Sequence, residues 1–383
     1  MPDAPTPSPY PIVLQVLPAL GGGGVERGTV EITAAIARAG GGALVVSAGG
    51  RMAPLVERAG GRNLFLPLAS RSPFRVWRNA AALATLIRNE RVDIVHARSR
   101  APAWSAWLAT RRTGTPFMTT YHGTYNENLP GKRRYNAVMA AGARVITASR
   151  FIAALIQARH GTDPARIRVI PRGVDPAIFD PEAVTAPRIA RLAAAWRVPD
   201  GQPTIMLPGR LTRWKGQAVA IQALARMRDR DAVLVLVGAH QGRAAYLREL
   251  LALAESLGVG PRLHVAGDCD DMPAALMLSD VVVNASTDPE AFGRVVIEAQ
   301  AMARPVIATD HGGAVETIDH GATGWRVPPS DPDALAAMLD HALSMSPDDR
   351  AALGARARAA VQQSYTVQAM QAATLDVYRE LLA

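Results

Sequence analysis

Short apolar runs alternate with longer stretches of helical periodicity along most of this chain. Strand-like runs are predicted at residues 12–17, 43–47, 63–66, 92–97, 116–121, 144–148 and 167–171, and again at 204–207, 233–237, 262–266, 281–284 and 306–308. Helical patterns separate them, for instance at 25–38, 76–89 and 101–111. Strands that alternate with helices in this way are typical of βαβ units and parallel sheets. The pattern therefore predicts an α/β protein with two successive doubly wound arrays.

A proline-rich segment separates the two arrays. Residues 171–181 read Pro-Arg-Gly-Val-Asp-Pro-Ala-Ile-Phe-Asp-Pro and have little periodicity, which is typical of an interdomain linker. We therefore predict one domain at 12–180 and a second at 181–365, since 383 residues suffice for two separate cores. A final helical stretch covers 366–382. Five prolines among the first eleven residues, without a cationic segment, predict a disordered tail at 1–11 and no signal peptide.

The basic residues are concentrated in the first half of the chain. The sequence contains 42 Lys and Arg residues and 33 Asp and Glu residues. Of these, 23 basic and 10 acidic residues precede residue 181, so the first half carries a net charge of +13 and the remainder a net charge of −4. A general preference for arginine accounts for part of the total, since only Lys132 and Lys215 are lysines, but not for the asymmetry. We therefore expect the first domain to face an anionic partner: a membrane surface, a phosphorylated acceptor or nucleic acid. The single cysteine, Cys269, and the absence of an apolar run of about 20 residues fit a cytoplasmic protein.

Two glutamates mark the segment that follows the apolar run at 281–284. Glu290 lies in a polar turn after this strand, and Glu298 falls on the first turns of the next helical pattern. Loops at the carboxyl ends of strands, leading into helix N-termini, are where open α/β sheets bind ligands. Carboxylates in such a loop accept hydrogen bonds from hydroxyl groups. The pair therefore predicts a ligand with hydroxyls at both ends, such as a nucleotide sugar.

A basic motif follows the first strand of the second domain. Residues 207–216 read Leu-Pro-Gly-Arg-Leu-Thr-Arg-Trp-Lys-Gly and include Gly209, Arg210 and Lys215. Lysine binds phosphate as a compact point charge, whereas arginine grips two oxygens with its planar fork. Arg210 and Lys215 together can neutralise a diphosphate leaving group without a metal, while Arg213 is expected at the solvated surface.

The glycines at 21–24 follow the first strand and lead into a helix. Backbone amides in such a position can approach a diphosphate. The run lacks the G-x-G-x-x-G spacing of dinucleotide-binding loops and the G-K-[ST] ending of a P-loop. Two interpretations remain open: a tight β–α turn that requires small residues, or a loop that closes over phosphate or acceptor.

With these motifs assembled, the sequence resembles the retaining glycosyltransferases of the GT4 family, which adopt the GT-B fold of two Rossmann-like domains facing a cleft. The motifs keep their order and approximate spacing over nearly the whole chain. They are the E-x7-E pair Glu290 and Glu298, the Gly-Arg-Leu…Lys-Gly run at 209–216, the Pro-x-Gly-Val-Asp linker at 171–175, the glycine loop followed by Glu26, and Gly312-Gly313-x-x-Glu316.

The resemblance implies roles for individual residues. Arg210 and Lys215 would contact the donor's phosphates, Glu298 the ribose hydroxyls and Glu290 the transferred sugar. His122, after the strand at 116–121, matches the family's active-site histidine, residues 262–271 would hold the base, and the last helix would pack back on the first domain. The implied catalytic residues are Glu290, His122, Arg210 and Lys215. The implied donor site comprises Gly23, Gly24, Gly209, Arg210, Lys215, Glu290, Ala291, Phe292, Gly293 and Glu298.

Three further features bear on this interpretation. Asp268 and Asp270 spell D-x-D, a metal motif of the other main glycosyltransferase fold, but acidic residues directly before the helical stretch 272–278 favour helix capping by Asp270 or Asp271. The basic cluster Lys132-Arg133-Arg134, expected in a loop, is either a solvated face or a contact with acceptor or membrane. Asn284 and the segment 287–289 depart from the family pattern and bear on the choice of sugar.

We therefore predict a retaining glycosyltransferase that needs no metal or other cofactor. It would move a hexose from a nucleotide diphosphate sugar, GDP-mannose in preference to UDP-glucose, to a lipid-linked or oligosaccharide acceptor such as lipopolysaccharide core. The enzyme would be cytoplasmic or peripheral on the inner face of a bacterial inner membrane. One alternative is a sugar-nucleotide epimerase or a phosphorylase-like enzyme. A phosphorylase would carry a lysine that binds a pyridoxal cofactor, and neither lysine of this chain suits that role. The other is a non-catalytic sugar- or nucleic-acid-binding protein, which the lack of interleaved aromatic residues disfavours.

Overall fold

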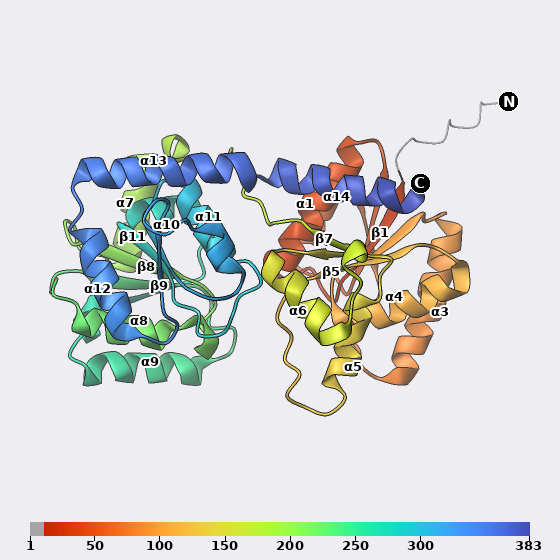
Figure 1. The fold of residues 1–383 in the computed structure, drawn as a ribbon, viewed down its shortest axis with the longest axis horizontal. Helices are drawn as coiled ribbons and strands as arrows, with labels where there is room; N and C mark the ends of the chain where they lie inside the picture. The colour runs from red at the N-terminus through yellow and green to blue at the C-terminus, as the bar shows by residue number, and fades with distance from the viewer. Residues whose placement is uncertain (1–10) are drawn as a thin grey trace. The chain divides into compact units, whose positions relative to one another are not determined.

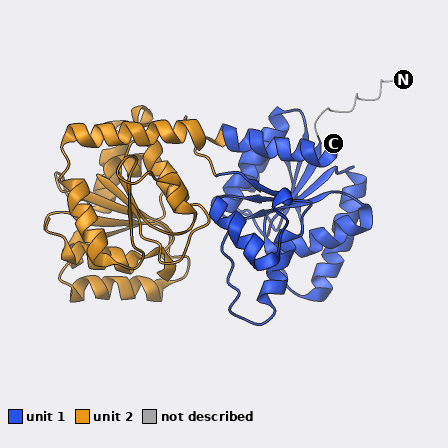
Figure 2. Ribbon diagram, viewed as in Figure 1, with its two compact units in different colours: residues 1–171, 368–383 blue, residues 172–367 orange. Residues whose placement is uncertain are grey.

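The chain forms two compact units, each with a parallel sheet and helices around it (Figures 1 and 2). The computed structural model describes residues 11–383, so the tail expected at 1–11 lies, except for Pro11, outside the described residues. Unit 1 comprises the residues up to Pro171 together with Gln368–Ala383, and unit 2 comprises Arg172–Val367. The predicted α/β class and the two parallel sheets are confirmed.

Unit 1 contains a seven-stranded sheet in the order β3-β2-β1-β4-β5-β6-β7. Its strands are β1 (Ile12–Val16), β2 (Gly42–Ser47), β3 (Arg62–Phe65), β4 (Ile94–Ala97), β5 (Phe117–Tyr121), β6 (Arg144–Thr147) and β7 (Ile167–Val169). Its helices are α1 (Gly24–Arg38), α2 (Ala53–Arg58), α3 (Pro73–Asn89), α4 (Arg100–Thr113), α5 (Lys132–Asn136), α6 (Arg150–His160) and α14 (Val367–Leu382), with 3-10 turns η1 (Ala137–Ala140) and η2 (Pro164–Arg166). Apart from the first residue of some of them, the inner strands are buried, as expected for a parallel sheet covered on both faces.

The helix α14 completes the core of unit 1, although unit 2 separates it from the rest of that unit in the sequence. Tyr378 on α14 is fully buried, and its hydroxyl lies 2.8 Å from Nδ1 of His96 in β4. The other ring nitrogen of His96 lies 2.7 Å from the hydroxyl oxygen of Thr120 in β5. Because a buried polar group needs a partner, this chain of hydrogen bonds fixes α14 in one position on the sheet.

Unit 2 contains a six-stranded sheet in the order β10-β9-β8-β11-β12-β13. Its strands are β8 (Thr204–Pro208), β9 (Val233–Val237), β10 (Leu263–Gly267), β11 (Val281–Asn284), β12 (Val306–Thr309) and β13 (Trp325–Val327). Its helices are α7 (Ala186–Trp196), α8 (Gln217–Arg226), α9 (Ala244–Ser256), α10 (Met272–Leu278), α11 (Arg294–Ala301), α12 (Pro332–Leu343) and α13 (Pro347–Ser364). The 3-10 turns are η3 (Pro181–Ala183), η4 (Arg213–Lys215), η5 (Gly260–Arg262) and η6 (Gly312–Thr317).

The observed division between the units differs from the predicted one. The sequence placed it after residue 180, whereas the units divide between Pro171 and Arg172. The reason is that the proline-rich segment packs on unit 2. The Val174 amide donates to the Tyr365 carbonyl at 2.9 Å, and Asp180 pairs with Arg358 at 2.8 Å. The segment is therefore part of unit 2 and not a free linker.

Within residues 11–383, no helix combines the length and the apolar character needed to cross a bilayer.

Candidate active site

The loops after β8 and β11 leave adjacent strands at the carboxyl edge of the sheet of unit 2. β8 pairs in parallel with β9 on one side and β11 on the other, so the order of the strands reverses there. Open α/β sheets bind ligands at such a switch point, because the two loops diverge and leave room between them. The basic motif at 209–216 and the glutamate loop at 285–293 therefore occupy the expected position of a ligand site.

The basic loop after β8 depends on a glycine. Gly216 has a φ of +73°, and a Cβ atom there would lie 1.8 Å from the carbonyl oxygen of Ala285, which begins the glutamate loop. Only glycine combines this φ with so close an approach. Arg210 follows Gly209 and is exposed, and no carboxylate within residues 11–383 pairs with its guanidinium. Its charge is therefore available to a ligand.

Lys215 and Glu290 form an ion pair that is almost fully buried. Their side chains are 13% and 12% exposed, and Nζ of Lys215 lies 2.6 Å from Oε1 of Glu290. Ser286 also hydrogen-bonds to this carboxylate, and the ammonium lies 4.6 Å from the centre of the Trp214 ring. Burial alone would raise the pKa of Glu290, but the charge and hydrogen bond of Lys215, together with Ser286, outweigh burial and lower the pKa below its usual range. Glu290 is therefore an ionised hydrogen-bond acceptor.

This pairing was not predicted. From the sequence, Lys215 was assigned to the phosphates and Glu290 to the sugar of one donor, as separate contacts. The structure shows that the two groups are in direct contact with each other. Arg213, in the same turn, is exposed and pairs with the exposed Glu249, as expected for a surface arginine.

Backbone contacts hold the glutamate loop in place. The Thr287 amide donates to the Trp214 carbonyl at 2.8 Å, which joins this loop to the basic loop. The Gly313 amide donates to the Glu290 carbonyl at 2.8 Å. Gly312 allows this approach, since its φ is +68° and a Cβ atom there would lie 2.6 Å from the same carbonyl oxygen. The glycine pair noted in the sequence therefore positions Glu290, and Ala291 next to it is partly exposed.

Polar residues at the end of β12 and just after it support the site, and they were not identified from the sequence. The Ser286 carbonyl accepts a hydrogen bond from the Thr309 hydroxyl at 2.9 Å and lies 2.8 Å from Nε2 of His311. The Ser286 hydroxyl lies 3.0 Å from Oδ1 of Asn284. The available signal was that polar residues follow both β11 and β12, but their adjacency requires knowledge of the strand order.

The start of α11 carries the other residues of the predicted donor site. Gly293 precedes the helix with a φ of +80°. Glu298 is 9% exposed and accepts a hydrogen bond from Nε of Arg294 at 3.0 Å, one helical turn away. The side chain of Phe292 is buried against Tyr365, with ring centres 5.8 Å apart. Phe292 therefore offers a ligand its backbone and not its ring.

The remaining predicted site residues belong to unit 1. Gly23 precedes α1 and Gly24 begins it, and both are exposed. The neighbouring Gly21 carbonyl accepts a hydrogen bond from Nε of Arg51 at 2.8 Å, which connects the loops after β1 and β2. His122 follows β5 directly and is partly buried. Each of these residues therefore lies at the carboxyl edge of the sheet of unit 1.

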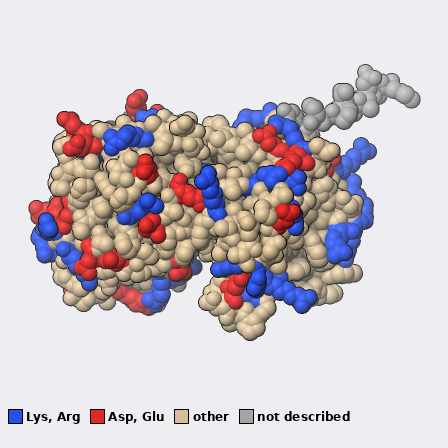
Figure 3. Space-filling model, in the orientation of Figure 1, with Lys and Arg blue, Asp and Glu red and all other residues tan. Residues whose placement is uncertain are grey.

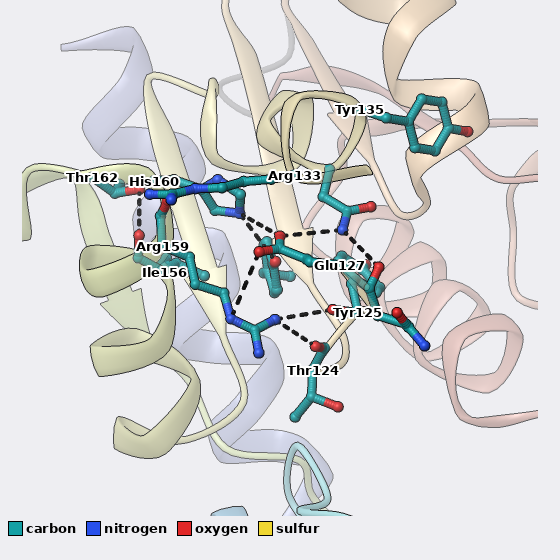
Figure 4. A network of polar contacts seen from close by, with 12 residues as sticks. Thr124, Tyr125, Glu127, Arg133, Tyr135, Ile156, Arg159, His160 and Thr162 are labelled. Carbon is teal, nitrogen blue, oxygen red and sulfur yellow. Dashed lines mark hydrogen bonds and ion pairs between the residues drawn. The ribbon is translucent and has the colours of Figure 1, made fainter. Parts of the chain in front are cut away.

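A polar network holds the segment after His122 (Figure 4). Nη1 of Arg159 donates to the carbonyls of Thr124 and Tyr125 at 2.8 and 2.9 Å. The Glu127 carboxylate lies 3.9 Å from Nε of Arg159 and 3.7 Å from Nε2 of His160. This segment is therefore attached to α6, which carries Arg159 and His160.

The basic cluster Lys132-Arg133-Arg134 lies on the short helix α5 and not in the expected loop. Arg133 and Arg134 are exposed, and Lys132 is partly buried. Nε of Arg133 donates to the carbonyl of Arg159 at 2.6 Å, which adds this residue to the network around Glu127.

The capping interpretation of the acidic segment is confirmed for Asp271. Its carboxylate accepts a hydrogen bond from the Ala274 amide at 3.2 Å at the start of α10. Both oxygens also accept hydrogen bonds from Arg188, at 2.7 and 3.0 Å, and these lower the pKa of Asp271. Asp271 is thus engaged by the protein itself.

Comparison with known proteins identifies the family. The family model described as "Glycosyl transferases group 1" matches residues 189–360, and "Glycosyltransferase Family 4" matches residues 22–178. A D-inositol 3-phosphate glycosyltransferase of Xylanimonas cellulosilytica is 33% identical over 306 residues, which cover 75% of this chain and 72% of the relative. The chain belongs to the GT4 family of glycosyltransferases.

Two other proteins illustrate the range of similar glycosyltransferases. A GDP-mannose-dependent alpha-(1-6)-phosphatidylinositol monomannoside mannosyltransferase of Mycobacterium tuberculosis is 32% identical over 264 residues, 66% of each chain. The crystal structure of a glycosyltransferase from Rickettsia africae ESF-5 is 35% identical and superposes with a TM-score of 0.90 over 98% of this chain and 99% of the other. The predicted GT-B fold and glycosyltransferase class are thus confirmed.

Proposed function

We propose that this GT4 glycosyltransferase transfers a hexosyl unit from a nucleotide diphosphate sugar to an acceptor hydroxyl, with retention at the anomeric carbon and without a metal. The Lys215–Glu290 pair carries the proposal, because it places a cation and an ionised carboxylate 2.6 Å apart at the switch point of the sheet. A diphosphate needs the cation, and sugar hydroxyls need the carboxylate. The exposed Arg210 supplies a further positive charge from the same loop.

The proposed chemistry is electrostatic. As the bond from the anomeric carbon to the phosphate oxygen breaks, positive charge develops on the sugar ring and negative charge on the departing diphosphate. Arg210, Lys215 and the amides at the start of α11 stabilise the departing group, which is commonly the largest catalytic contribution. Glu290 accepts hydrogen bonds from sugar hydroxyls and favours the positive ring. The acceptor oxygen attacks on the face that the phosphate leaves, and the departing phosphate oxygen takes its proton.

The donor and acceptor are proposed by class. GDP-mannose is proposed in preference to UDP-glucose, which the name of the mycobacterial relative supports. The names of both relatives refer to acceptors that contain phosphate, and the first half of this chain carries +13. We propose a lipid-linked or oligosaccharide acceptor that bears phosphate, of which lipopolysaccharide core is one example, with Lys132, Arg133 and Arg134 as candidate contacts.

Thermal-shift measurements with UDP, GDP and ADP test the donor site directly. We expect one nucleotide to raise the melting temperature, and the corresponding nucleotide sugar to be hydrolysed slowly in the absence of acceptor. Activity should persist in EDTA, and NMR of the product should show the anomeric configuration of the donor. A melting temperature unchanged by all three nucleotides would argue against the donor site, and complete loss of activity in EDTA would argue against metal-independent transfer.

A further inference from the structure

The two segments that carry α3 and α4, residues 58–89 and 94–126, contain no carboxylates. No Asp or Glu occurs between Glu57 and Glu90, or between Asp93 and Glu127, and these two segments contain ten arginines. Lys and Arg side chains gather on the surface of unit 1 over α3 and α5 (Figure 3). Protein surfaces usually intersperse charges of both signs. A surface of a single sign selects an anionic partner.

Two large aromatic side chains project from the same helix. Phe74 is 70% exposed and Trp77 is 59% exposed, and a spacing of three residues places them on one face of α3. Arg75 and Arg78 are exposed beside them. The guanidinium of Arg112 on α4 lies 5.4 Å from the centre of the Trp77 ring. Exposed aromatic rings among cationic side chains are typical of surfaces that bind at a membrane interface, where the rings lie at the level of the headgroups.

An apolar pocket of about 230 Å³ opens beside the start of α3. Trp104 on α4 and Tyr135 on α5 form one wall, with ring centres 6.4 Å apart. The indole N–H of Trp104 donates to the Tyr135 carbonyl at 3.1 Å, so its polar atom is already bonded. Pro73 lines the pocket, and the exposed Arg71 lies at its edge. Apolar walls with a cation at the edge suit the apolar part of an amphiphile whose head is an anion.

We propose that this face of unit 1 docks on an anionic lipid bilayer. We call it the docking face and define it by Arg71, Phe74, Arg75, Trp77 and Arg78 with the adjoining pocket. Phe74 and Trp77 enter the headgroup layer, the arginines bind lipid phosphates, and the pocket receives the apolar end of one lipid. This proposal gives the proposed glycosyltransferase a lipid bilayer as a further partner. Its test measures binding to lipid and does not depend on catalytic turnover.

Two other partners suit the docking face less well. Nucleic acid would neutralise the arginines, but it has no apolar group for the pocket, and Arg112 already lies over the Trp77 ring that a base would need. A second copy of this chain would bring the arginines of two docking faces together, and like charges would repel. A bilayer with anionic headgroups satisfies the charge, the aromatic rings and the pocket together.

Vesicle co-sedimentation of the full chain tests the proposal. We expect binding to vesicles of phosphatidylcholine mixed with phosphatidylglycerol, little binding to phosphatidylcholine alone, and weaker binding as salt rises. The double variants Phe74→Ser/Trp77→Ser and Arg75→Gln/Arg78→Gln should each weaken binding by about tenfold or more. The matched control is Leu251→Ser/Arg248→Gln on α9 of unit 2, where both residues are also exposed, and it should bind as the parent does.

Two outcomes would overturn the proposal. One is that the parent does not bind vesicles, or that both double variants bind them as the parent does while their melting temperatures also match the parent's. The other is loss of binding to a DNA duplex in these variants without any vesicle binding, which would assign the face to nucleic acid. The variants should retain nucleotide-induced thermal shifts and donor hydrolysis, so failure of the docking proposal is distinguishable from failure of the proposed reaction.

Discussion

The ammonium of Lys215 and the carboxylate of Glu290 are in direct contact, although the two residues are 75 positions apart in the sequence. Each charge is the partner of the other in this structure. In the proposed reaction a donor would exchange these partners: its phosphate would take the place of Glu290 beside Lys215, and its sugar hydroxyls would take the place of Lys215 beside Glu290. The pair also keeps the carboxylate ionised before the donor arrives.

Replacing Lys215 should impair both catalysis and stability. In Lys215→Met we expect turnover to fall by about 10²- to 10³-fold, as for the loss of one group that stabilises charge in the transition state. The free energy of unfolding should fall by about 3 kcal/mol, because Glu290 is left as a buried, unpaired carboxylate. Nucleotide-release assays and urea denaturation measure the two effects.

Two controls separate these effects. Arg213→Met, in the same turn but exposed, should change neither the turnover nor the free energy of unfolding appreciably. The double variant Lys215→Met/Glu290→Gln should recover much of the lost stability and none of the activity. Activity near the parent level in Lys215→Met would show that this lysine does not contact the donor.

Replacing Glu298 should affect binding of the donor more than the chemical step. Glu298→Gln keeps the shape of the side chain but removes its charge, so hydrogen bonds to the ribose hydroxyls weaken by about 1.4 kcal/mol. We expect the KM for the donor to rise about tenfold, with kcat nearly unchanged, in steady-state kinetics. Asp288→Asn, exposed in the preceding loop, is the control. A fall in kcat at constant KM would contradict the assignment to ribose.

Gly216 should not tolerate a side chain. In Gly216→Ala, the new Cβ atom would overlap the Ala285 carbonyl and the backbone would remain at a positive φ. We expect a loss of at least about 3 kcal/mol of stability, or rearrangement of both loops of the site. Gly201→Ala is the matched control, because Gly201 has a φ of +75° and a Cβ atom there would meet nothing within 4 Å. That variant should lose only about 1 kcal/mol in denaturant titrations; equal losses in the two variants would show that the contact with Ala285 is unimportant.

Acid should weaken the attachment of α14 to unit 1. Hydrogen bonds from Arg168 and Arg144 lower the pKa of Glu380 to about 2. Because this value lies below that of the unfolded chain, about 4.3, the stabilisation is complete above that pH and is lost as the pH falls toward 2. The side chain is 33% exposed, so solvent reduces the contribution to about 1 kcal/mol.

Glu380→Gln should therefore be less stable than the parent at pH 7 by about 1 kcal/mol. This difference in the free energy of unfolding should shrink below about pH 4. Urea denaturation at a series of pH values measures it. Asp376→Asn, whose partner Arg379 lies on the same exposed helical face, should show no such trend. A constant difference at all pH values would mean that the carboxylate charge is not the cause.

The positions of the inner strands could be predicted from the sequence, because strands buried on both faces are continuous apolar runs. The predicted runs at 233–237 and 281–284 coincide with β9 and β11. The short edge strand β13 could not be predicted, since Arg326 interrupts its three residues. The division between the units was misplaced because the proline-rich segment pairs with residues around Thr366, and composition does not indicate a contact across that distance.

For the candidate site, the sequence indicated two loops that the structure brings into contact, but not the contacts between them. Arg210, Lys215 and Glu290 were assigned because they follow strands, and their roles toward a donor remain predictions. The contact between Lys215 and Glu290 depends on β8 lying beside β11, which the order along the chain does not state. The support from Thr309 and His311 depends in the same way on β12 lying beside β11.

The burial of Tyr378 against His96 has a consequence for how the protein is made. Because α14 follows unit 2 along the chain, the ribosome completes all of Arg172–Val367 before it makes the helix that closes unit 1. Unit 2 is continuous and can fold as soon as it emerges. The half of the protein that is begun first is therefore finished last, which reverses the usual order in which domains mature during synthesis.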